Sequence, residues 1–290
     1  MLLRCTALLS RLPLRVHYAF ADSLLFPIMY HLVRYRRKGV AKNLSNAFPE
    51  KSHQERKTIE RAFYHQFCDT IVETIYGFRI SAEEMKQRVV FENADEVDHA
   101  AKTAGGCVVM LAHVGCWEWM SSCQQWFSPE VLELNVYRKA KRESTDKALL
   151  EIRKKRGGAY VEKQRLLREM VRYRVEKQAI VLGLIADQKP RPEVTRTWVY
   201  FLHQETGFLD GGEELAKRFN YPVYALTVKC PQRGHYQCRF ELLSNDPKAT
   251  GQGAITAAYA RNLEKNIIEQ PELWLWSHNR FKWKRTKDEV

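Results

Sequence analysis

The chain has 290 residues, of which 45% are hydrophobic and 28% charged, and this ordinary composition argues against a disordered chain or a protein with many membrane spans. The 47 Lys and Arg residues outnumber the 34 Asp and Glu residues, and the net charge of +13 favours anionic lipid, an acidic protein or nucleic acid as partner. The seven cysteines are an odd number without Cys-x-x-Cys spacing, which argues against a disulfide framework or a zinc ribbon and indicates a reducing compartment.

The N-terminal part of the chain is first apolar and then basic. Residues 16–33 are rich in apolar and aromatic side chains, but Asp22, Pro27 and two histidines make them a poor membrane-spanning helix. Four cations follow in Arg34-Tyr-Arg-Arg-Lys38, and this pattern suits a helix that lies in the interface of an anionic membrane. The alternative is a helix that packs on the protein body and ends in solvated basic residues.

The rest of the chain lacks a visible boundary. It contains no internal repeat and no linker rich in Pro, Gly or Ser. We therefore predict a membrane-associated N-terminal segment over residues 1–38 and a single α/β domain over residues 39–290.

Two helix starts can be read from capping boxes. Ser52-His-Gln-Glu55 precedes apolar residues at near-helical spacing from Ile59 to Tyr76, which predicts a long amphipathic helix. Ser81-Ala-Glu-Glu84 is a second box of the same kind.

After the second box, short apolar runs alternate with charged segments of helical length. Such runs are typical of strands that are buried on both faces of a sheet. The rhythm therefore predicts a mainly parallel central sheet flanked by helices. The predicted strands are residues 106–112, 131–137, 179–186 and 222–229.

The first of these strands delivers His113 to its carboxyl end, the edge at which ligands bind in open α/β sheets. Gly115 allows a bend before a helix-like stretch from Trp117 to Phe127, and that bend would bring Glu118 back toward His113. A carboxylate on one imidazole nitrogen fixes the tautomer and supports a general base at the other. The alternative is a capping histidine and a surface glutamate.

At this point the residues resemble the bacterial lipid A late (lauroyl/myristoyl) acyltransferases, which carry a His-x4-Asp/Glu motif. The resemblance covers nearly the whole chain, and its weak motifs occur in the family's order. They are Tyr35-Arg-Arg-Lys38, Asn43-Leu44, Phe48-Pro49-Glu50, Phe63-Tyr64, Glu73, the His113 motif, Val136-Tyr137-Arg138, Ala186-Asp187-Gln188, Phe201-Leu-His-Gln-Glu-Thr206 with Gly211, and Trp276-Ser-His-Asn-Arg280-Phe-Lys282. Glu118 stands where the family often has Asp.

The resemblance implies a glycerol-phosphate-acyltransferase-like fold and an enzyme of lipopolysaccharide synthesis. Such an enzyme moves a fatty acyl chain from a thioester, on acyl carrier protein or coenzyme A, to a hydroxyl of a lipid A precursor. The reaction needs a base but no cofactor, so His113 is the expected general base and Glu118 its orienting carboxylate. The expected place is the cytoplasmic face of the bacterial inner membrane, with peripheral or monotopic attachment and an acidic carrier protein as partner.

Four further residues are candidates for substrate binding. Arg138 and the backbone N–H groups of the turn 114–117 are candidate donors to the oxyanion of the reaction. Asp187 ends another predicted strand and is expected to orient Arg138, a lysine or the following helix, and Gln188 and Thr206 belong to the resembling segments.

Other chemistries fit the sequence less well. Cys116 is expected to be a packing residue rather than a nucleophile, because no separate group is placed to orient a Cys-His pair. No metal site is expected, since His113, Glu118 and Asp187 lack a spacing such as His-Glu-x-x-His.

Three alternative functions remain open. The chain could acylate another lipid, such as a lysophospholipid or an amino-acid lipid, or release acyl groups to water as a hydrolase. It could also be a basic nucleic-acid-binding module, but cations at both ends beside an apolar segment favour a membrane, and no nucleic acid is expected.

Overall fold

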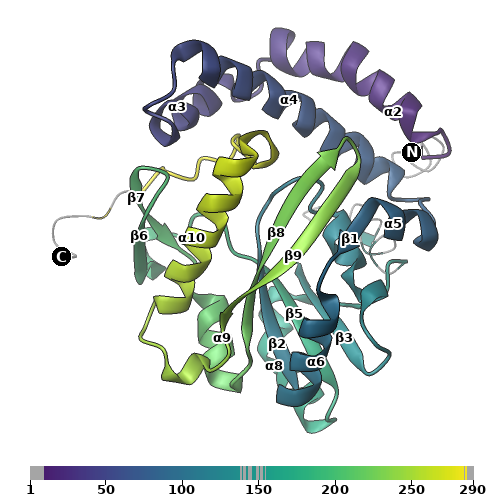
Figure 1. Cartoon of the computed structure of the whole chain (residues 1–290), viewed down its shortest axis with the longest axis vertical. Helices are drawn as coiled ribbons and strands as arrows, with labels where there is room; N and C mark the ends of the chain where they lie inside the picture. The colour runs from purple at the N-terminus through teal and green to yellow at the C-terminus, as the bar shows by residue number, and fades with distance from the viewer. Residues whose placement is uncertain are drawn as a thin grey trace.

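The centre of the computed structural model is a seven-stranded sheet in the order β1-β9-β8-β2-β5-β3-β4 (Figure 1). The structure describes residues 10–283 and 285, apart from residues 138, 140–141, 143–145, 148–149, 151–152 and 154. The strands of the large sheet are β1 (Val89–Phe91), β2 (Gly106–Leu111), β3 (Val131–Tyr137), β4 (Ala159–Glu162), β5 (Ala179–Ile185), β8 (Val223–Gln232) and β9 (His235–Ser244).

The sheet is mostly parallel, as the apolar runs predicted. Strands β8, β2, β5, β3 and β4 run in one direction, whereas β9 pairs antiparallel with β8 and β1 pairs parallel with β9. The four predicted strands are β2, β3, β5 and β8, and the first five residues of β2 are buried without alternation. A strand covered on both faces is a continuous run of apolar residues in the sequence. These four strands could therefore be predicted from their apolar runs.

Helices pack around the sheet and at its end. Helix α6 contacts β2 and β5, α8 contacts β4 and β5, α9 contacts β2, and α10 contacts β8. The α-helices are α2 (Leu14–Phe20), α3 (Arg37–Ala47), α4 (His53–Tyr76), α5 (Ala82–Arg88), α6 (Ala94–Ala104), α8 (Leu166–Val175), α9 (Gly211–Phe219) and α10 (Ala254–Glu269). The short helices are η1 (Ala21–Leu25), η2 (Ile28–Leu32), η3 (Trp119–Trp126), η4 (Lys163–Arg165), η5 (Pro192–Val194), η6 (Pro247–Ala249) and η7 (Pro271–Leu273). The α/β fold with a parallel sheet between helices is thus confirmed.

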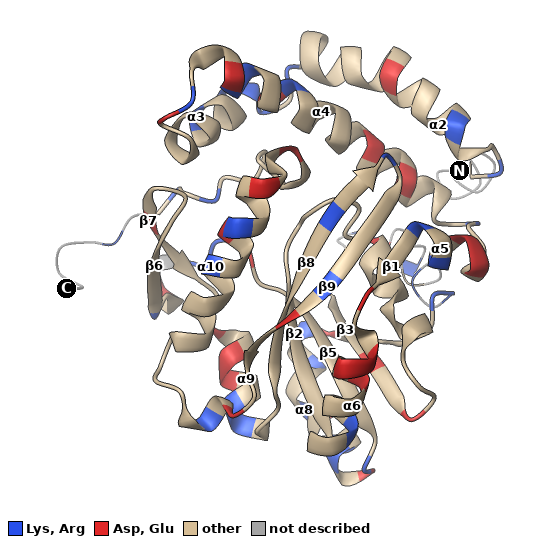
Figure 2. Cartoon of the chain, viewed as in Figure 1, with Lys and Arg blue, Asp and Glu red and all other residues tan. Residues whose placement is uncertain are grey.

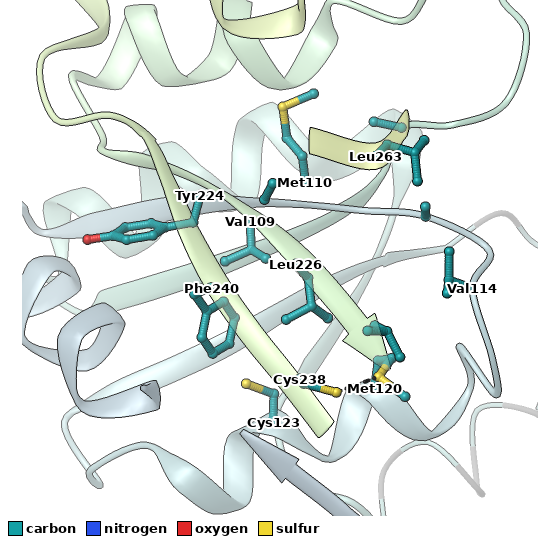
Figure 3. Packing of buried hydrophobic residues seen from close by; sticks show 14 of the residues in the cluster. Val109, Met110, Val114, Met120, Cys123, Tyr224, Leu226, Cys238, Phe240 and Leu263 are labelled. Atoms are coloured by element: carbon teal, nitrogen blue, oxygen red, sulfur yellow. Dashed lines mark hydrogen bonds between the residues drawn. The ribbon is translucent and has the colours of Figure 1, made fainter. Parts of the chain in front are cut away.

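The core lies between the sheet and the helices that cover it. Figure 3 shows side chains of β2, β8 and β9 meeting Met120 and Cys123 from η3, and Leu263 from α10. Phe240 and Cys238 project from β9 into this layer, and both are buried. The large sheet and η3 therefore form one packed unit, which fixes the segment that follows β2.

Helix α4 begins at the predicted capping box and crosses the carboxyl end of the sheet. The Ser52 hydroxyl accepts the Glu55 N–H, and the Glu55 carboxylate accepts the Ser52 N–H. Farther along α4, the Thr70 hydroxyl donates to the carbonyl oxygen of Gly115 over 3.3 Å. The helix thereby holds the segment that leaves β2. The second predicted cap is also present, since Ser81 Oγ accepts the Glu84 N–H at the start of α5.

The N-terminal helical segment, α2 with the π-helical turns η1 and η2, packs along the outside of α4 (Figure 1). The Tyr18 hydroxyl donates to the Glu73 carboxylate over 2.7 Å, and the rings of Phe26 and His65 stack with centroids 3.7 Å apart. Over its described residues the segment therefore packs on the protein body, as the alternative interpretation expected. The boundary between residues 38 and 39 stays a prediction.

The opposite side of this segment is apolar and exposed. Val16, Phe20 and Leu24 are spaced four residues apart and are 41%, 49% and 48% exposed, and Leu32 near its end is 75% exposed. Within the part of the chain that the structure describes, no helix has both the length and the hydropathy needed to cross a bilayer.

A two-stranded sheet stands beside the large one. Its strands β6 (Thr197–Phe201) and β7 (Gln204–Phe208) pair antiparallel around Leu202 and His203. Both turn residues have positive φ, 49° and 60°, as a two-residue type I′ hairpin requires. The segment that the sequence singled out around Thr206 is therefore this hairpin.

Candidate active site

His113 lies just beyond the carboxyl end of β2, where the sequence placed it. Gly115 has φ of +58°, and a Cβ at this residue would lie 2.6 Å from the Tyr236 ring, so the bend requires glycine. The chain then enters η3, so the predicted helix-like stretch is present as a tight 3₁₀ helix. Bend and helix turn the residues after His113 back over the end of the sheet.

The carboxylate on His113 comes from Asp187, which follows β5, the neighbour of β2 in the sheet. Asp187 Oδ1 lies 2.7 Å from His113 Nδ1, and Oδ2 accepts the His113 backbone N–H over 3.0 Å. Oδ2 also accepts the Trp274 indole N–H over 3.0 Å. Asp187 is 3% exposed. Three donors therefore fix the carboxylate, and it in turn fixes the imidazole.

The pair is tuned by burial and by mutual charge. Burial lowers the pKa of His113, but the charge and hydrogen bond of Asp187, with a smaller contribution from Glu118, raise it above its usual value. Burial raises the pKa of Asp187, but the charge of His113 and the surrounding donors hold it below its usual value. Asp187 is therefore ionised at neutral pH, and it accepts the Nδ1 proton of His113 and leaves Nε2 as the basic nitrogen.

The free nitrogen faces a pocket of about 310 Å³. Gln188 Nε2 lies 3.3 Å from His113 Nε2, and the Trp117 ring meets the imidazole edge to face with centroids 5.1 Å apart. The pocket is lined by residues from β2, β3, β4, β5 and η3 and from the segments that follow β2, β3 and β5: Leu111, His113, Trp117, Glu118, Met120, Ser121, Asn135, Val136, Tyr137, Arg153, Tyr160, Gly183, Ile185 and Gln188. The pocket wall thus combines polar and apolar side chains, with Gln188 and Trp117 next to His113.

The predicted pairing of Glu118 with His113 is not what the structure shows. Glu118 lines the same pocket, but its carboxylate accepts two hydrogen bonds from Arg153, over 2.9 and 3.3 Å. The reason is geometric, because Asp187 already occupies the Nδ1 side of the ring. The carboxylate that the sequence argument assigned to Glu118 is supplied by Asp187, and Glu118 instead holds an arginine at the pocket wall.

The predicted oxyanion donors are partly committed elsewhere. The Val114 N–H donates to Ala112 O, and the Gly115 N–H donates to Leu273 O. Among the described residues, no acceptor contacts the N–H groups of Cys116 and Trp117. These two N–H groups therefore remain as the candidate oxyanion donors of the turn. Arg138, the other predicted donor, lies outside the described residues.

Cys116 is a packing residue. Its side chain is fully buried, and burial with the nearby charge of Glu73 raises the pKa of its thiol well above the usual value. A buried protonated thiol is a poor nucleophile, which agrees with the sequence interpretation.

Thr206 does not reach the pocket. Its hydroxyl accepts a hydrogen bond from Arg280 Nη1 over 2.9 Å, and Arg280 Nη2 donates to Gly207 O over 2.6 Å. Arg280 is buried against the Phe208 ring. The hairpin β6–β7 therefore anchors the C-terminal segment that carries Trp274.

Sequence reasoning missed three residues of this site. Trp274 donates to Asp187, Arg153 pairs with Glu118, and His278 lies close enough to His113 and Asp187 for their charges to act on it. Burial, with nearby cations, lowers the pKa of His278 to about 4, so this ring is neutral at pH 7. Trp274 and His278 lie within or beside a segment that the sequence singled out, whereas nothing distinguishes Arg153 from the basic residues around it.

One comparison with known proteins found a match. A family model described as bacterial lipid A biosynthesis acyltransferase matches residues 3–283. A search among curated proteins found no match.

Proposed function

The chain belongs to the bacterial lipid A biosynthesis acyltransferase family, and from this premise we propose that His113 is the general base of its acyl transfer. The substrates we propose are a fatty acyl thioester and a hydroxyl group of a lipid A precursor. The observation that carries the proposal is the buried Asp187 carboxylate on His113 Nδ1, which leaves Nε2 directed at the pocket.

The proposed reaction balances without a cofactor. The acceptor oxygen attacks the thioester carbonyl while its proton passes to His113 Nε2. The tetrahedral intermediate then collapses, the C–S bond breaks, and the imidazolium returns the proton to the leaving thiolate. Asp187 stabilises the imidazolium throughout. Gln188, whose amide contacts Nε2 in the free enzyme, must turn aside to admit the hydroxyl.

Arg153 is the described cation best placed to act on the developing oxyanion. It lines the pocket with His113, and its ion pair with Glu118 holds it there. Under this proposal Glu118 acts through Arg153 rather than through the imidazole. Arg138 keeps the predicted role of substrate binding as a proposal.

The proposed donor is an acyl carrier protein, and the proposed place is the cytoplasmic face of the inner membrane. The net charge of +13 supports an acidic protein partner. The exposed apolar side of α2 and η1, beside Arg11, Arg15 and Arg34, supports peripheral attachment to an anionic bilayer.

The test is transfer by the His113→Ala variant. Lipid products are measured by mass spectrometry with acyl carrier protein and coenzyme A thioesters as donors, with and without a lipid A precursor. We expect the loss of about 10²–10⁴-fold in transfer rate that general-base assistance contributes. The unfolding temperature should fall only in part, because Asp187 keeps its hydrogen bonds from the backbone N–H of residue 113 and from Trp274 when the ring is removed.

Two results would overturn the proposal. Free fatty acid without acylated lipid, from every donor and acceptor, would indicate a hydrolase. Equal loss of transfer and of folding stability in His113→Ala would make His113 a structural residue.

A further inference from the structure

Two lysines share one aromatic ring beside the pocket. Lys189 Nζ lies 5.7 Å and Lys282 Nζ 4.2 Å from the centroid of the Trp283 ring. A third cation, Arg36, donates from Nη1 to Ser277 O over 3.0 Å, in the same C-terminal segment. Arg36, Lys189 and Lys282 are distant in sequence but lie near one another in the fold. We call these three residues the cation cluster.

The cation cluster has no carboxylate partner among the described residues. The ion pairs of those residues include none of its three members, and Arg285 farther along pairs with Glu205. Burial lowers the pKa of Lys189, and the charges of Lys282, Arg280 and Arg36 lower it further. The charges that lower the pKa of Lys189 are thus those of neighbouring cations, and an anion bound among them would be attracted by all of them.

The cluster borders the place where the acyl group is transferred. Lys189 directly follows Gln188, whose amide contacts His113 Nε2. The charges of both His113 and Lys189 act on the half-buried His278, so this ring lies near both residues. A molecule bound at His113 can therefore place an anionic group on the cluster.

Contacts between the two ends of the chain hold the cluster in place. Asn43 of α3 donates to the carbonyl oxygens of Trp276 and His278, over 2.9 and 3.2 Å. Arg36, just before α3, has a left-handed φ of 50°, an uncommon conformation for a residue with a side chain. Figure 2 shows the blue Lys and Arg positions near the start of α3 and on the C-terminal segment that passes beside it.

We propose that Arg36, Lys189 and Lys282 bind a phosphate group of the acceptor lipid and so direct its hydroxyl to His113. The inference rests on the proposed function and names a feature of its substrate. Phosphate fits because its oxygens accept several charge-assisted hydrogen bonds at once. A bilayer surface fits less well, because the cluster lies beside the pocket rather than on the exposed apolar side of α2.

The test compares acceptors with and without phosphate in the Lys189→Ala/Lys282→Ala double variant. For the phosphorylated acceptor, we expect KM to rise about a hundredfold or more with kcat little changed, because two charge-assisted contacts are lost. With the enzymatically dephosphorylated acceptor, variant and wild type should have similar KM. Lys248→Ala is the matched control, since that exposed lysine of η6 follows β9 at the other end of the sheet.

A second arm separates the sources of phosphate. Inorganic phosphate should compete with the phosphorylated acceptor for wild type and lose this effect in the double variant. A rise in the KM of the acyl carrier donor alone would overturn the inference in favour of the donor's phosphopantetheine arm. Equal KM changes for both acceptors would overturn it in favour of general attraction to the membrane.

The results for the wild type separate a failure of this inference from a failure of the proposed function. If wild type transfers acyl groups equally well to both acceptors, the phosphate inference fails while His113 keeps its role. If wild type transfers to neither, the proposed function itself fails.

Discussion

Asp187 binds Nδ1 of the His113 ring and so leaves Nε2 as the basic nitrogen. The buried carboxylate accepts hydrogen bonds from the ring Nδ1, the His113 backbone N–H and the Trp274 indole N–H. A neutral side chain of the same shape would keep the contacts but lose the charge. The pH dependence of the rate therefore reports on this one pair.

We expect kcat/KM of the wild type to fall as the pH drops through the pKa of His113, because the protonated ring cannot act as a base. That pKa is raised, so the acid limb should lie above the usual histidine value. In Asp187→Asn the stabilising charge is gone while burial remains, and the limb should move to lower pH. The plateau rate should fall by about 10²-fold or more.

Glu118→Gln is the matched control, because Glu118 makes the smaller contribution to the pKa of His113. Its acid limb should stay near that of the wild type, while loss of the Arg153 pair lowers the plateau rate. A larger pH shift in Glu118→Gln than in Asp187→Asn would restore the pairing of His113 with Glu118.

Helix α4 joins three parts of the molecule at a single buried residue, Glu73. Glu73 accepts the hydroxyl of Tyr18 from α2 and that of Tyr236 from β9, each over 2.7 Å. Its own carbonyl oxygen accepts the Trp119 indole N–H at the start of η3. Burial raises the pKa of Glu73 to about 7, although both tyrosine hydrogen bonds oppose the shift.

The raised pKa predicts a pH-dependent stability. A folded-state pKa above the unfolded value stabilises the fold at low pH, and this contribution is lost as the pH rises through about 7. The shift corresponds to about 3 kcal/mol at about 1.4 kcal/mol per pH unit. Urea unfolding at pH 5 and pH 8 should therefore show a smaller difference for Glu73→Gln than for the wild type.

A control for this experiment is Glu55→Gln, which keeps a cap acceptor in an exposed first turn of α4. Its difference between pH 5 and pH 8 should equal that of the wild type. If Glu73→Gln shows the full wild-type difference, the ionisation of Glu73 is not linked to folding.

At the scale of the whole molecule, the N-terminal helical segment packs on the protein with one side and exposes apolar residues on the other, the side that we propose attaches to the membrane. Leu14, Ala21 and Tyr30 are buried, whereas Val16, Phe20 and Leu24 are exposed. Deletion of the segment would strip α4 of its cover, so a loss of membrane binding after deletion would be ambiguous. Substitution on the exposed side alone avoids this ambiguity.

We expect Phe20→Ser/Leu24→Ser to weaken binding to vesicles that contain anionic lipid, in sedimentation assays, because it removes apolar surface from the interface. The unfolding temperature should change little. Raised salt should weaken wild-type binding further, because it screens the basic residues. Unchanged sedimentation of the double variant would place the attachment surface elsewhere.

Local patterns in the sequence determined much of this protein. Local spacing is the basis of the capping box at Ser52, the helix cap at Ser81, the four buried strands and the position of His113. Helix capping and strand burial in such short segments depend on the spacing of polar and apolar residues along the chain, and this spacing can be read from the sequence. The family could be identified for the same reason, since its motifs keep their order.

Tertiary structure alone decided which groups meet. Asp187 is 74 residues from His113, and the two touch because β2 and β5 are neighbours in the sheet. The hydrogen bonds of Trp274 with Asp187 and of Arg36 with Ser277 form because the C-terminal segment returns to α3. Strand order and chain return are set by packing of the whole core, so the sequence placed His113 but could not choose between Glu118 and Asp187 as its partner.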